Sequence, residues 1–176
     1  VYHYSQRPVR YANRIIDLVL EMQHPDGSFV IGGGGGACED VDGVDILVNL
    51  YKQTGHRPLA VRLALNRALE AVLSQQIPNS GFVYRHRAPM NLLSLPRTQI
   101  PADTADMFST WFRVHTIALI CQVLSEHPLA RINWQFNQVC SMGWHRAGGL
   151  PQPQSDPWQD RIALPILQKQ LNHLWI

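Results

Sequence analysis

A short pattern of residues occurs three times in this chain and limits the folds open to it. The copies read Gln23-His-Pro-Asp-Gly-Ser-Phe29, Gln76-Ile-Pro-Asn-Ser-Gly-Phe82 and Gln138-Val-Cys-Ser-Met-Gly-Trp144. In each copy a glutamine precedes a turn, a glycine and an aromatic residue, and an apolar stretch with helical spacing comes just before it. Copies of one supersecondary unit at intervals of about 50–60 residues are typical of repeat architectures. The sequence therefore predicts shape more strongly than chemistry.

Apolar spacing predicts six helices and no strand. The helices are expected near residues 11–22, 40–54, 59–75, 103–125 and 129–140, with the last beginning near Pro165. The fourth is apolar nearly all round, which suits a helix buried on several sides. We expect one all-α domain over residues 1–176, made of three helix pairs. The expected core faces are Ile15, Leu18, Val19 and Met22; Val44, Leu47, Val48 and Tyr51; Val61, Leu65, Leu69 and Val72; Leu129, Ile132, Phe136 and Val139; Leu167, Leu171 and Leu174.

Composition excludes several classes of function. The chain is 45% hydrophobic and 16% charged, and its formal charge of +2 argues against a nucleic-acid footprint or a polybasic membrane surface. No stretch approaches 18 apolar residues, so no membrane span is expected. Three scattered cysteines do not make a disulfide framework, which favours a reducing, cytoplasmic location. The chain does not begin with Met, which favours a processed product or a piece of a longer protein.

The glutamine–turn–glycine–aromatic pattern resembles the glutamine–tryptophan repeat of squalene cyclases and related α/α toroids. That superfamily also includes class II terpene cyclases, protein prenyltransferase β subunits and several (α/α)6 carbohydrate-active enzymes. The resemblance runs from about residue 10 to 175 and implies inner helices nested within outer ones, as an arc or partial (α/α) toroid. Three pairs would form half of a six-pair ring. Because exposed repeat faces cannot bury their apolar sides alone, we expect a homo-oligomer or a longer parent chain rather than a lone arc.

Carboxylates gather where the expected inner helices begin. Acids in a first turn cap free N–H groups and complement the helix dipole, and this structural role is one interpretation. The first group is denser than capping requires, and like charges in a partly dry site would keep at least one carboxyl group protonated to act as an acid. The acids are Glu39, Asp40, Asp42 and Asp45 in the first group, Asp103 and Asp106 in the second, and Asp156 and Asp160 in the third.

The first acidic group also resembles the D-x-D-D motif of class II terpene cyclases. In that family the middle aspartate protonates an alkene or epoxide, and the resemblance carries this role onto Asp42. The fourth position of the motif is Gly43 in this chain, not aspartate. The expected pocket lining is partly aromatic, with charged residues among the rings: Phe82, Tyr84, Trp111 and Trp144.

Two of the three loops that follow the pattern are basic, and we expect them to meet the acids at one mouth. Such a cavity would suit a polar or anionic small molecule, with histidine as a proton-transfer partner and arginine as an anion clamp. An Asp–Arg network that only holds repeat to repeat is the alternative. The loop residues are Tyr84, Arg85, His86 and Arg87, and Trp144, His145 and Arg146.

A metal site is not expected. Prenyltransferase β subunits and lanthionine cyclases hold zinc inside such toroids, and Cys38-x-Asp40 with His86 or His145 could imitate that ligand set. The order of Asp and Cys is reversed, however, and no His/Cys pair has ligand spacing. Residues 32–36, five glycines, and residues 147–158 are expected to be flexible rather than packed, and His115, Cys121 and Cys140 to be core residues.

Two classes of function remain open. The first is an enzyme acting on a small polar or isoprenoid molecule without a cofactor, with Asp42 as general acid. Asp40, Asp45 and Asp106 would assist it. Substrate would be bound by Tyr84, Arg85, His86, Asp103, Trp111, Trp144, His145 and Arg146. The second is a non-catalytic binding or assembly module in which the same charges are structural caps.

Overall fold

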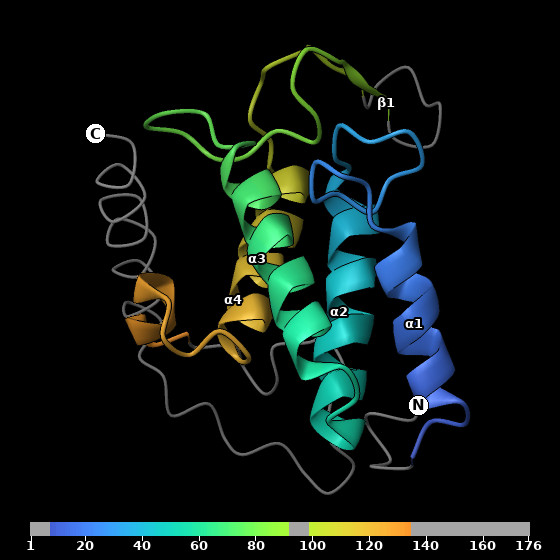
Figure 1. Cartoon of the computed structure of the whole chain (residues 1–176). Coiled ribbons are helices and arrows are strands. Elements are labelled where there is room, and N and C mark those ends of the chain that lie inside the picture. Colours follow the sequence, from blue (N-terminus) through green and yellow to red (C-terminus); the bar gives the residue numbers. More distant parts are fainter. Residues whose placement is uncertain (1–7, 92–98, 135–176) are drawn as a thin grey trace, which may run out of the picture.

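The computed structural model describes residues 8–91 and 99–134. This part contains four α-helices: α1 (Ala12–Met22), α2 (Ala37–Thr54), α3 (Pro58–Leu73) and α4 (Met107–Cys121). The helices lie alongside one another with alternating direction, and α1 forms one edge of the group (Figure 1). Long loops connect them at one end, which we call the loop end, where α2 and α4 begin. The mainly helical fold class is confirmed, and no helix in these ranges is long and apolar enough to cross a membrane.

Local chemistry explains where the helices begin and end. Gly55 follows α2 in the left-handed conformation (φ 65°) and donates its N–H to the carbonyl of Tyr51, so the predicted glycine stop is confirmed. Pro58 occupies the first turn of α3, where its missing N–H has no helical partner to lose. Asp106 caps α4 by accepting a hydrogen bond from the N–H of Ser109.

The predicted core faces of α2 and α3 are confirmed. That of α1 is partly wrong, and the fourth helix, expected to be buried on several sides, exposes Trp111 (49%). Val61, Leu65, Leu69 and Val72 of α3 are all at most 2% exposed, and α4 is buried along most of its length. On α1, however, Leu18 and Met22 are 54% and 53% exposed. The buried residues of α1 are Ala12, Ile16 and Val19. The sequence places apolar residues on most sides of α1, so only its neighbours decide which side is buried.

Several predicted boundaries and elements differ from the structure. Helix α2 begins three residues earlier than expected, and α4 begins only after Asp106 because Asp103 has a left-handed backbone (φ 56°). In place of a fifth α-helix there is a short 3₁₀ helix, η3 (Pro128–Arg131), after which residues 132–134 are not helical. The rest of the fifth helix and the whole sixth lie outside the described residues.

A small hairpin also contradicts the expectation of no strands. Strand β1 (Met90–Asn91) pairs antiparallel with β2 (Gln99–Ile100), and Met90 lies opposite Ile100. Strands of two residues are too short to produce a readable alternation of apolar and polar positions.

The first two copies of the repeated pattern form turns with matching backbone hydrogen bonds. In the first, His24 N donates to Ser28 O over 2.8 Å; in the second, Ile77 N donates to Gly81 O over 2.9 Å. A second bond within each turn spans fewer residues, from Gly27 N to His24 O in the first and from Ser80 N to Ile77 O in the second. The third copy lies outside the described residues.

Candidate functional site

A buried ion pair joins the beginning of α2 to the middle of α4. Asp40 is 1% exposed and Arg113 is 0% exposed, and Arg113 Nη1 donates to Asp40 Oδ2. The same oxygen accepts a bond from Gly36 N (3.2 Å), while Oδ1 accepts one from Phe29 N (2.8 Å). Arg113 Nη2 also donates to the Tyr84 carbonyl (2.7 Å). Both oxygens of Asp40 therefore hold the protein together at the loop end.

Arg113 did not emerge from the sequence pattern, although one signal pointed to it. Apart from Arg113, α4 contains no Asp, Glu, Lys or Arg. A lone guanidinium in an apolar helix requires an anionic partner when buried, because an unpaired buried charge is strongly destabilising.

The second cluster consists of Cys38, Glu39 and Tyr84, all half-buried. The Tyr84 hydroxyl lies 2.8 and 2.7 Å from the two carboxylate oxygens of Glu39, and the Cys38 thiol donates to Glu39 over 3.1 Å. Burial favours a raised pKa for Glu39, but the Tyr84 and Cys38 donors outweigh it and lower that pKa. Burial raises the pKa of both Tyr84 and Cys38, so these groups stay protonated as donors.

Asp42 lies one turn after Glu39 on α2, and its pKa is shifted in the opposite direction. Although much of its surface remains exposed, partial burial and the charge of Glu39 both raise the pKa of Asp42. Asp45, the next acid on the helix, accepts a bond from Asn49 Nδ2 over 2.9 Å. The four acids of the first group thus have different surroundings.

The glycine run is packed, contrary to the prediction of a flexible loop. Arg85 Nε donates to Gly35 O over 2.8 Å, and Arg85 Nη2 donates to Gly33 O over 3.2 Å. Asp26 accepts bonds from the backbone N–H groups of Gly34 and Ser28. Burial opposes ionisation of Asp26, but these donors and the Ser28 hydroxyl lower its pKa. Residues 32–35 have positive φ angles, which glycine adopts at little cost.

A third polar contact fastens the segment after Tyr84 to the residues before α4. His86 Nδ1 lies 2.7 Å from Asp103 Oδ1, and His86 Nε2 lies 2.8 Å from the Ser74 carbonyl. Both partners are acceptors, so the two bonds form together only when the imidazole carries both protons. The N–H of Arg87, and then His86, lower the pKa of Asp103. One residue of this basic loop, His86, therefore meets an acid, Asp103, and the second basic loop lies outside the described residues.

Two further predicted site residues, Asp106 and Trp111, make other contacts. Asp106 Oδ1 accepts from Ser109 N over 2.8 Å, which is a capping role. Trp111 is 49% exposed, with its ring 5.4 Å from that of His115. His115 is 3% exposed, in keeping with the predicted core position, and burial lowers its pKa. Trp144, His145 and Arg146 lie outside the described residues.

The possible metal ligands have other partners. Within residues 8–91 and 99–134, no group of three or more His, Cys, Asp or Glu side chains could hold a metal ion. Cys38 bonds to Glu39, Asp40 pairs with Arg113, and His86 contacts Asp103.

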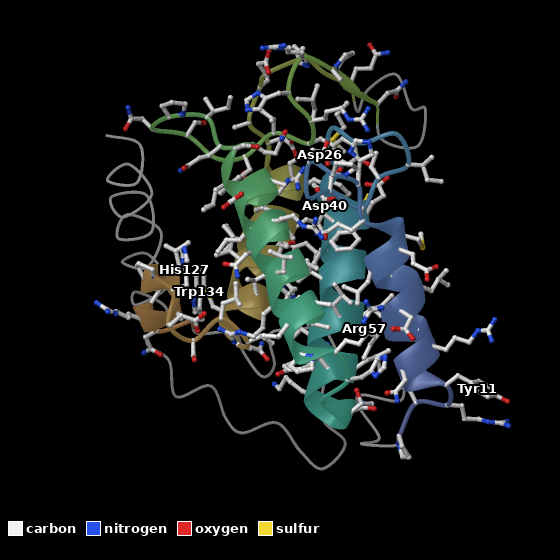
Figure 2. All side chains as sticks on the ribbon, viewed as in Figure 1. Tyr11, Asp26, Asp40, Arg57, His127 and Trp134 are labelled. Atoms are coloured by element: carbon white, nitrogen blue, oxygen red, sulfur yellow. The ribbon has the colours of Figure 1, made fainter. Side chains whose placement is uncertain are left out.

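Both repeated turns thus bring polar groups to the loop end, where Asp26 and Asp40 are seen in Figure 2. The network there contains a buried part, Asp40 and Arg113, and a part that reaches solvent, Glu39 and Asp42. No protein-family model, no curated protein and no solved structure matches this chain.

Proposed function

We propose that this chain is a helix-pair repeat protein that protonates a small polar or isoprenoid molecule at its loop end, with Asp42 as general acid. The observation that carries the proposal is the contrast between two carboxyl groups one helical turn apart. The pKa of Asp42 is raised, whereas that of Glu39 is lowered. Neighbouring carboxyl groups whose pKa values are driven apart commonly divide into an acid and an ionised partner.

The chemistry follows from this division. A protonated Asp42 donates its proton to a basic oxygen or a double bond of the substrate. Glu39 remains ionised because Tyr84 and Cys38 donate to it, and its charge stabilises the positive charge that develops on the substrate. Ionised Asp42 then lies beside ionised Glu39, and this repulsion favours return of a proton to Asp42.

The helix-pair arrangement is supported by the two turns. Besides their shared backbone bonds, each turn places the N–H of its phenylalanine on a side chain of the following helix. Phe29 N donates to Asp40 over 2.8 Å, and Phe82 N donates to Thr110 Oγ1 over 2.9 Å. We assign α1 and α3 as outer helices and α2 and α4 as inner helices.

A second candidate function is a non-catalytic binding or assembly module. It is favoured by the internal use of most charges at the loop end. Asp40 pairs with Arg113, Asp106 caps α4, and Asp103 binds His86. Under this alternative the carboxylates stabilise the fold and Asp42 has no ligand.

Titration of the carboxyl groups by carbon-detected NMR tests the acid directly. We expect Asp42 to titrate above the ordinary value of 3.8 and its pKa to fall in Glu39→Gln. An Asp42 that titrates at or below 3.8 in the wild-type chain would contradict the proposed role.

Binding of dimethylgeranylamine, an ammonium mimic of a cationic isoprenoid intermediate, separates the two candidate functions. In Glu39→Gln the Kd of this ligand should rise about tenfold or more, because its ammonium group loses a charged partner. Glu70→Gln, the same change at an exposed acid of α3, is the matched control and should leave the Kd unchanged. Equal binding by the wild type and Glu39→Gln would favour the structural module. A gain in stability of Asp42→Asn would support the enzyme, because removal of a like charge relieves repulsion.

A further inference from the structure

The two helix pairs can be compared residue by residue, with unit 1 defined as α1 and α2 and unit 2 as α3 and α4. The matching turn bonds align His24 with Ile77. Counting back along the helices from this point aligns three buried residues of α1, Ala12, Ile16 and Val19, with three buried residues of α3, Leu65, Leu69 and Val72. The inward faces of the outer helices therefore correspond.

A second face is buried on α3 but exposed on α1. Ala64, Ala68 and Gln75 of α3 are 0%, 1% and 9% exposed. Their counterparts in unit 1 are Tyr11, Ile15 and Met22. Tyr11 is 72% exposed and Met22 is 53% exposed, while Ile15 between them is half-buried. Leu18, on the same side of α1, is 54% exposed. Tyr11 points away from the other helices in Figure 2.

The turn of unit 1 covers this second face on α3. Gln23 Nε2 donates to the Ala64 carbonyl over 2.8 Å, and Arg67 Nη2 donates back to Gln23 Oε1 over 3.0 Å. Gly27 packs directly on the carbonyl of Arg67, where a Cβ atom would not fit. Unit 2 thus packs against one side of unit 1 through its outer helix, α3.

The inner helices have the same asymmetry. The bonds from the two phenylalanine N–H groups align Asp40 with Thr110, and hence Ile46 of α2 with Thr116 of α4. Ile46 is 36% exposed, whereas Thr116 is fully buried. Both helices of unit 1 therefore expose the side that unit 2 buries. We call this side the α1 edge: Tyr11, Ile15, Leu18, Met22 and Ile46.

We propose that the α1 edge binds a second copy of this chain, through the side of unit 2 that matches the side of unit 1 covering α3. Terminal units of repeat proteins require a polar outer face to stay separate, and the α1 edge is apolar. The internal contact identifies the kind of partner, because the corresponding face of α3 is covered by a helix pair. Unit 2 has the same turn bonds as unit 1, and its turn residues Asn79 and Ser80 are exposed, so each copy offers this side and the contact is head to tail. This proposal rests on the helix-pair repeat but not on any role of Asp42.

Sedimentation velocity of the full chain over a range of concentrations tests the proposal. The wild type should form dimers or larger assemblies, and Leu18→Glu with Met22→Glu should raise the Kd of assembly about 100-fold or more. The matched control is Leu59→Glu with Leu63→Glu, two leucines at the same spacing on α3 that are 83% and 58% exposed. The control pair should leave the assembly unchanged.

A wild type that stays monomeric at a chain concentration of about 100 μM, high enough to populate a weak interface, would overturn the proposal. Unchanged assembly of the α1 variant, or equal dissociation of the control, would also overturn it. If the α1 variant does not fold, hydrogen exchange of the wild type decides: protection of α1 amides should increase with protein concentration, and constant protection contradicts the proposal.

Discussion

Units 1 and 2 have the same kind of turn but differ in the group that accepts the phenylalanine N–H of the turn. In unit 2 the phenylalanine N–H donates to the neutral hydroxyl of Thr110, and Asp106 caps α4. In unit 1 the equivalent N–H donates to the carboxylate of Asp40, and α2 begins after Gly36 without a side-chain cap. Because a buried charge requires a counter-ion, Asp40 of unit 1 and Arg113 of unit 2 depend on each other. The comparison indicates that the turn of unit 1 is tied to the other unit by an ion pair, whereas the turn of unit 2 uses a neutral group of its own unit.

The largest expected effect on stability comes from removing Arg113, the buried partner of Asp40. Arg113→Met should reduce the free energy of unfolding by about 3–5 kcal/mol, because it leaves Asp40 as an uncompensated buried charge. Urea denaturation followed by circular dichroism measures the change. The double variant Arg113→Met with Asp40→Asn should lose less than the sum of the two single changes. Additive losses would show that the pair does not couple the units.

A second prediction concerns Gly43, which aligns with Arg113 when Asp40 is aligned with Thr110. A Cβ atom on Gly43 would lie 2.5 Å from Cγ of the Phe29 ring. We therefore expect Gly43→Ala to destabilise the protein by about 1–3 kcal/mol through overpacking. Phe29→Ala removes the ring that causes the clash, so the double variant should lose less stability than the sum of the two single changes, as measured by urea denaturation. A stability gain in Gly43→Ala, as ordinary helix propensity would produce, contradicts the packing argument.

The cap of α4 should contribute less. Asp106→Ala should reduce the free energy of unfolding by about 0.5–2 kcal/mol, because the N–H of Ser109 loses its acceptor. Asp106→Asn retains an acceptor oxygen and should be close to the wild type. If both variants lose the same stability, the charge of Asp106 rather than its hydrogen bond is what matters.

The smallest expected effect is a pH dependence at Asp26. The folded state lowers the pKa of Asp26 from its ordinary value of 3.8, so its contribution to stability is complete above that pH and is lost as the pH falls below it. The stability difference between the wild type and Asp26→Asn should therefore shrink on acidification from pH 5. Because Asp26 is solvent-exposed, we expect this difference to stay below about 1 kcal/mol. A difference independent of pH would exclude an ionic contribution.

Local sequence signals predicted the elements well where chemistry is local. The glycine stop of α2 and the buried face of α3 follow from backbone geometry and apolar spacing. The sequence also predicted contact between basic loop residues and acids, and His86 does contact Asp103. Both residues lie in the segment between α3 and α4. The acids could not be told apart, however, because Asp40 and Asp42 are two residues apart and differ only in what packs around them.

Residue order alone was enough to fix the first two repeated turns and the course of α1, α2 and α3, since turns, caps and apolar spacing act over a few residues. Only the tertiary structure decided which side of α1 is buried, that the glycine run is packed, and that Arg113 is the partner of Asp40. The physical reason is that burial and pairing depend on groups brought together from distant parts of the chain. The pKa values of Glu39 and Asp42 depend on the same surroundings, and so does the candidate chemistry.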